Sequence, residues 1–126
     1  MSLSWHDPDK ETIEQALRRF PAESGMCAPL ARVVLSVARP IDASATGLQV
    51  KPKTPARYIL PKHPRVSVWY SHTLVRTREH HVDALTGAGG CEHDIYLPTH
   101  WNYPEALRLN SVDVNTVDAG VQHAEK

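Results

Sequence analysis

With 126 residues, 41% of them hydrophobic, the chain is long enough to fold as one domain around its own core. Lys and Arg total 14, as do Asp and Glu, so the formal net charge is zero, without the basic field that selects nucleic acid or an anionic membrane. The longest apolar run contains Arg32 and is shorter than the roughly 20 residues that span a bilayer. We therefore expect neither a nucleic-acid nor a membrane partner.

The N-terminal segment is polar and acidic, so it lacks the basic and then apolar pattern of a secretory signal. Cys27 and Cys91 are the only cysteines, which allows one disulfide between them but no disulfide framework. This usage favours a reducing compartment. We expect a cytoplasmic protein, with export as part of a larger toxin or effector as the alternative.

A first helix is expected near the N-terminus, with Asp7 as its N-cap and Pro8 at the first helical position. Apolar residues then recur at the spacing of one helical face, and Pro21 ends the helix. These residues are Ile13, Ala16, Leu17 and Phe20.

A second helix is expected over residues 27–38, which are apolar almost all round, as in a helix buried in the middle of a domain. Pro29 lacks an N–H and belongs in a first turn, so Cys27 should lie within a residue or two of the helix N-terminus. Arg39 and Pro40 end this helix.

Residues 41–64 hold four prolines among scattered polar residues, which predicts a long irregular connection with a short strand over 57–60. Three strands should follow over 66–70, 72–77 and 80–85, with a turn near Arg78 and Glu79. Residues 86–90 read as a flexible loop, 94–97 as a further strand, and 102–109 as a short helix.

This order of helices before strands predicts an α+β fold, with N-terminal helices packed on a small antiparallel sheet. We expect residues 1–110 to form a single catalytic domain. Residues 111–126 contain few large apolar side chains and should form a weak edge strand or a flexible tail.

Cys27 is the strongest candidate for a functional residue. A helix N-terminus carries partial positive charge and unpaired N–H groups, which favour the thiolate and can receive the oxyanion of a tetrahedral intermediate. The alternative is a buried structural cysteine. The surrounding residues, from Gly25 to Pro29, and the pattern downstream favour the nucleophile.

His72 and Asp83 are the expected base and orienting carboxylate. A two-residue turn at Arg78 and Glu79 sets them one diagonal step apart on the same face of the hairpin, and a turn at Thr77 and Arg78 sets them directly opposite. A three-residue turn would place them on opposite faces. The alternatives are an exposed strand histidine and a turn carboxylate. His80 and His81 compete for the role of base, although neither can face Asp83 across this hairpin.

Three short segments resemble the papain-like fold superfamily, in particular bacterial papain-fold toxin domains and transglutaminase-like or deamidase effectors. They are Gly25-Met-Cys27-Ala-Pro-Leu-Ala31, Ser71-His72-Thr-Leu-Val-Arg76 and His81-Val-Asp83-Ala-Leu-Thr-Gly87. The resemblance implies a Cys27, His72 and Asp83 triad that needs no cofactor. Papain has asparagine as its third member and a glutamine before its cysteine, where this chain has Ala22, Glu23 and Ser24, so a second oxyanion donor is unassigned.

The expected function is therefore acyl transfer from an amide of a protein or peptide substrate through a Cys27 thioester, of protease, glutamine deamidase or transglutaminase type. Trp101 and Tyr103 are candidates for the walls of a substrate groove. The rival functions are a non-catalytic binding module of the same fold and a cell-wall peptide amidase. The segment 91–94, with His80 and His81, offers metal-ligand types without clean zinc spacing, so no metal is expected.

Overall fold

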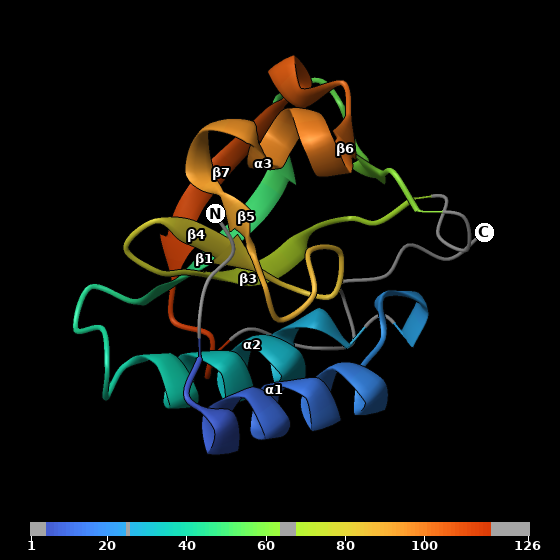
Figure 1. Ribbon diagram of the computed structural model, residues 1–126. Coiled ribbons are helices and arrows are strands. Elements are labelled where there is room, and N and C mark those ends of the chain that lie inside the picture. Colours follow the sequence, from blue (N-terminus) through green and yellow to red (C-terminus); the bar gives the residue numbers. More distant parts are fainter. Residues whose placement is uncertain (1–4, 25, 64–67, 117–126) are drawn as a thin grey trace.

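The computed structural model, which describes residues 5–24, 26–63 and 68–116, has an α+β architecture in three layers (Figure 1). Two helices, α1 (Asp7–Arg19) and α2 (Cys27–Ala38), lie under a five-stranded antiparallel sheet. A third helix, α3 (His93–His100), lies over the opposite face beside a two-stranded sheet of β2 (Leu60–Pro61) and β6 (Trp101–Asn102). The expected α+β fold is confirmed.

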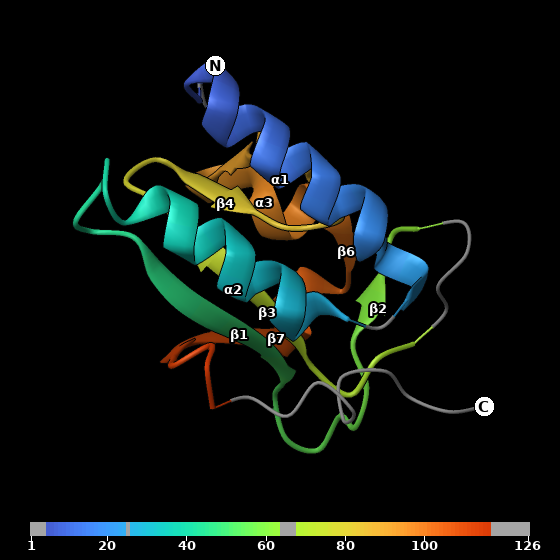
Figure 2. The same cartoon turned by 90° about the horizontal axis from the view of Figure 1, so that it is seen from below.

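The large sheet has the order β5-β4-β3-β1-β7. Its strands are β1 (Thr46–Pro52), β3 (His72–Arg76), β4 (His80–Val82), β5 (Cys91–Glu92) and β7 (Leu107–Val112). Figure 2, from below, shows α1 and α2 side by side across the lower face of this sheet. The first strand in the chain is therefore interior, because β3 and β7 pair with it on either side.

Both N-terminal helices occur where the sequence predicts them. The N-cap of α1 is His6 rather than Asp7, a one-residue shift at a helix end. Helix α2 begins at Cys27 itself and ends at Ala38, and seven of its residues are buried, as its apolar composition predicts.

The prediction of an irregular connection over 41–64 is wrong for β1. Leu48 and Val50 are buried on one face of this strand and pack with Leu74 of β3. Gly47 and the polar residues that alternate with the buried ones give this segment a low intrinsic propensity for β-structure. The strand forms because it pairs with a neighbouring strand on each side. The short strand expected at 57–60 is displaced toward β2, with Ile59 in an isolated bridge.

The β3–β4 hairpin has one of the two expected registers, the one with its turn at Arg78 and Glu79. Val75 pairs with Val82 and Arg76 with His81, and the N–H of Thr77 donates to the carbonyl of His80 at 2.8 Å. The turn therefore consists of Arg78 and Glu79, as expected. Of the strand expected at 66–70, residues 66 and 67 lie outside the described residues, and Trp69 pairs only with Ile59 in the described part.

The C-terminal part differs most from the prediction. Residues 94–97 belong to α3 rather than to a strand, and the expected helix over 102–109 is reduced to a 3₁₀ turn, Pro104–Ala106, that leads into β7. The edge strand begins earlier than expected, at Leu107, because it pairs with β1 from Gly47 to Pro52. Val114 follows it into the core, and residues 117–126 lie outside the described residues.

The core has two parts, one on each face of the sheet. The lower part joins α1 and α2 to Val75 and Val82. The upper part holds the large aromatic residues, with Trp69, Tyr96 and Trp101 all at most 2% exposed. Among the helices in the described ranges, none combines the length and the apolar character that crossing a bilayer requires.

Gly47 is the position in β1 with no room for a side chain. A Cβ there would lie 2.7 Å from the carbonyl oxygen of Val112, which is backbone and cannot rotate away. We expect Gly47→Ala to lower the free energy of unfolding by about 1–3 kcal/mol through overpacking. Urea unfolding measures this change in stability, and the control is Asn110→Ala at an exposed position of β7. Equal midpoints for the two variants would contradict the packing at β1.

Candidate active site

The structure brings Cys27, His72 and Asp83 together from three separate elements. Cys27 is the first residue of α2, His72 is the first residue of β3, and Asp83 follows the last residue of β4. His72 Nε2 lies 2.8 Å from Asp83 Oδ2, and the backbone N–H of Thr73 donates to Cys27 Sγ at 3.3 Å. A thiol, an imidazole and a carboxylate thus form one contiguous group at the end of β3.

The electrostatics of this group favour a charged imidazole. Burial opposes the charged form of His72, but the hydrogen bond to Asp83, the neighbouring Cys27 sulfur and the charges of both partners outweigh it and raise its pKa to about 10. Asp83 occupies Nε2, and the other ring nitrogen, Nδ1, is buried without a hydrogen-bond partner among the described residues. At neutral pH His72 is therefore a cation between a carboxylate and a thiol.

Asp83 has all of its carboxylate oxygens in hydrogen bonds. Its Oδ1 accepts from the backbone N–H groups of Leu85 and Thr86, each at 2.9 Å, and its Oδ2 accepts from His72 and from the hydroxyl of Tyr96. Burial raises the pKa of Asp83, but His72, Tyr96 and Thr86 together bring it below its ordinary value. The carboxylate is therefore held ionised in a site that excludes water.

Tyr96 is the residue that reasoning from the sequence missed. It comes from α3, a segment expected to be a strand, and it is fully buried. A tyrosine that is spaced one helical turn from His93 and His100 carries no local signal of contact with Asp83. Only the packing of α3 on the upper face of the sheet places its hydroxyl there.

Two tryptophans enclose the imidazole of His72. Trp69 stacks on it with ring centroids 4.9 Å apart and planes 4° apart, and Trp101 lies at 5.4 Å on a tilted plane. Trp101, a candidate groove wall, is thus wholly buried against His72, whereas Tyr103 is 64% exposed. His72 itself is 0% exposed and Cys27 is 8% exposed, so the group is covered in this conformation.

The first turn of α2, which begins at Cys27, carries backbone donors. The helical hydrogen bonds begin with the N–H of Leu30, which donates to the carbonyl of Met26, and the N-cap residue provides no side-chain cap. The N–H groups before Leu30 are therefore not used by the helix's own hydrogen bonds. Their direction and the helix dipole favour negative charge at this end, including an oxyanion.

The competing histidines lie elsewhere. His81 stacks on Tyr96 at 4.7 Å, and burial and the charge of His93 lower its pKa to about 4, so it is neutral at pH 7. The described part of the structure contains no group of three or more His, Cys, Asp or Glu side chains arranged to hold a metal ion. Cys27 and Cys91 are both free thiols, so the disulfide considered between them is absent.

Comparisons with protein-family models, with curated proteins and with solved structures found no match to this chain.

The proton on His72 should make stability depend on pH. Folding raises the pKa of His72 from 6.5 to about 10, so its contribution is fully present below about pH 6.5 and is lost as the pH approaches 10. We expect the free energy of unfolding, measured with urea, to fall across this interval. Asp83→Asn should flatten the fall, while Asp113→Asn on the exposed surface should keep it. A wild-type profile that is level over this interval would refute the raised pKa.

The hydroxyl of Tyr96 should matter at acid pH. It helps to lower the pKa of Asp83, and the stability that comes from this ionised carboxylate is present above the ordinary pKa of 3.8 and is lost as the pH falls through the folded value. Tyr96→Phe should therefore unfold at a higher pH than wild type in an acid titration followed by circular dichroism. Tyr103→Phe is the control, and superimposable curves for both variants would rule out this role of Tyr96.

Proposed function

We propose that this protein is a cysteine-dependent acyl-transfer enzyme of the papain-like type that acts on amides of proteins or peptides. The observation that carries the proposal is the convergence of the Cys27 thiol, the charged His72 imidazole and the Asp83 carboxylate at the N-terminus of α2. A buried ion pair is costly, so its presence beside a thiol suggests chemistry rather than stability.

In the proposed reaction His72 holds the proton of the Cys27 thiol, and the thiolate sulfur attacks the carbonyl carbon of the amide. As the C–S bond forms, the carbonyl electron pair moves to oxygen, where the N–H groups of the first turn of α2 stabilise it. The C–N bond then breaks, and His72 gives its proton to the leaving amine. Water or a second amine then attacks the thioester and loses a proton to His72, the C–S bond breaks, and the Cys27 thiolate and protonated His72 are restored.

Asp83 orients the imidazole and stabilises its charge throughout this cycle. The backbone N–H of Thr73 holds the sulfur beside the ring. Protease, glutamine deamidase and transglutaminase activity share these steps and differ in the amide attacked and in the acceptor of the acyl group. A role as a toxin or effector domain belongs to the same proposal.

A non-catalytic binding module is the second candidate, because the whole group is covered. His72 is enclosed by Trp69 and Trp101, and a cavity of about 420 Å³ lies away from the triad. That cavity is lined by Arg78, Glu79, His80, Glu92, His93 and Asp94. Under this alternative Cys27 has no unusual reactivity, which makes thiol chemistry the decisive measurement.

The two cysteines form a matched pair for this measurement, since each is 8% exposed. Burial raises the pKa of the Cys91 thiol, whereas Cys27 lies beside a cationic imidazole. At pH 7 we expect iodoacetamide to alkylate Cys27 faster than Cys91 by a factor of about ten or more, because the thiolate is the nucleophile. Mass spectrometry of the digested protein gives both rates from one sample.

His72→Ala should bring the alkylation rate of Cys27 down to that of Cys91, and Asp83→Asn should lower it in part. His80→Ala removes another buried histidine from the same hairpin and serves as the matched control. Equal, slow alkylation of both thiols in the wild-type protein would favour the binding module and end the enzyme proposal.

A further inference from the structure

A second cavity, separate from the triad, opens on the upper face of the sheet. Its volume is about 330 Å³, within the usual range of small-molecule sites. It is lined by Leu48, Arg76, His81, His93, Leu109 and Ser111. These residues come from four neighbouring strands and from the first residue of α3, so the sheet forms the floor and α3 bounds one end.

The strand register explains why these side chains share one face. Arg76 pairs directly with His81 across β3 and β4, and Leu48 pairs with Ser111 across β1 and β7. His93 is fixed at the end of the cavity because its Nε2 lies 2.9 Å from the carbonyl oxygen of Thr77. The cavity therefore has a cationic side at Arg76 and an apolar side at Leu48 and Leu109.

Two of the polar residues that line this cavity, Arg76 and His81, have side-chain groups without a partner in the part of the chain that the structure describes. Among the described residues, Arg76 makes no ion pair, and both ring nitrogens of His81 are buried without a hydrogen-bond partner although the residue is only 4% exposed. Leaving such nitrogens unpaired is costly, which favours a ligand that satisfies them. No carboxylate lines the cavity, in contrast to the larger one, which has Glu79, Glu92 and Asp94 in its walls.

The surroundings of His81 indicate a positive potential. Burial is the main cause of its lowered pKa, and the charges of His93 and Arg76 lower it further, while Asp83 opposes them. Asp83 is already engaged with His72, Tyr96 and two backbone N–H groups, so it does not neutralise Arg76.

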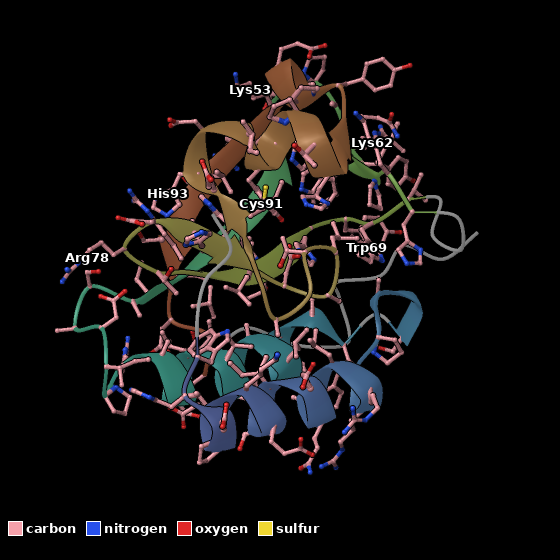
Figure 3. All side chains as sticks on the ribbon, in the orientation of Figure 1. Lys53, Lys62, Trp69, Arg78, Cys91 and His93 are labelled. Carbon is pink, nitrogen blue, oxygen red and sulfur yellow. The ribbon has the colours of Figure 1, made fainter. Side chains whose placement is uncertain are left out.

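The site is distinct from the triad. His93 lies toward one end of the β3–β4 hairpin, whereas Trp69, which stacks on His72, lies toward the other end (Figure 3). Arg78, at the hairpin turn, points outward beyond His93 and does not line this cavity.

From this juxtaposition we propose that the cavity over β1, β3, β4 and β7 binds a small organic anion, with its carboxylate or phosphate group on Arg76, His81 and Ser111 and its apolar body against Leu48 and Leu109. The guanidinium supplies the charge-assisted hydrogen bonds, and the neutral His81 ring and the Ser111 hydroxyl complete the donors. This site does not depend on the acyl-transfer proposal.

Binding is tested on the full chain with three probes that share a phenyl ring, namely benzoate, phenyl phosphate and neutral benzyl alcohol. Titration followed by ¹H–¹⁵N NMR should show saturable shifts at Arg76, His81 and Ser111 with an anion and none with the alcohol. Tighter binding of phenyl phosphate assigns a phosphate ester, and tighter binding of benzoate assigns a carboxylate. Added salt should weaken either interaction.

Arg76→Gln should weaken anion binding by at least about tenfold, as expected for loss of a charge-assisted hydrogen bond. Arg78→Gln removes a charge of the same sign two residues away and should leave the affinity unchanged. Both side chains are exposed, so both variants should fold. The proposal fails if the anions bind no better than benzyl alcohol, if both variants lose affinity equally, or if the shifts map away from this cavity.

Discussion

The ion pair between His72 and Asp83 is the interaction on which the rest of the upper half of the molecule depends. Both side chains are at most 2% exposed, and two opposite charges in such a place are tolerated only with good geometry and further hydrogen bonds. The 2.8 Å contact supplies the geometry. Tyr96 and the N–H groups of Leu85 and Thr86 supply the remaining hydrogen bonds of the carboxylate.

Several features of the fold follow from enclosing this pair. The chain turns directly after β4, so that residues 85 and 86 direct their N–H groups back to Asp83. Helix α3 crosses the upper face and delivers Tyr96, and β6 begins with Trp101, which packs on the imidazole with Trp69. Tyr96, Trp69 and Trp101 thus together enclose one charged contact.

The burial of Cys27, His72 and Asp83 affects both their electrostatics and the access of a substrate to the sulfur. A dry site strengthens the attraction between the imidazolium and its neighbours. An amide must nevertheless reach the sulfur, and Cys27 and His72 are both almost covered in this conformation. For acyl transfer, entry of substrate would therefore have to displace part of the cover over the sulfur.

The sequence by itself determined the two N-terminal helices and reduced the β3–β4 hairpin to two registers, in both of which His72 and Asp83 share a face. Each rests on local rules: helical periodicity, a proline in a first turn, and a two-residue turn that fixes which side chains share a face. Cys27 could be placed at a helix N-terminus for the same reason. Only the tertiary structure decided the position of β1 in the interior of the sheet, the identity of α3, and the roles of Tyr96 and Trp69 around His72. Those features depend on pairing and packing between segments far apart in the chain, where the stabilisation gained by burial overrides weak local preference.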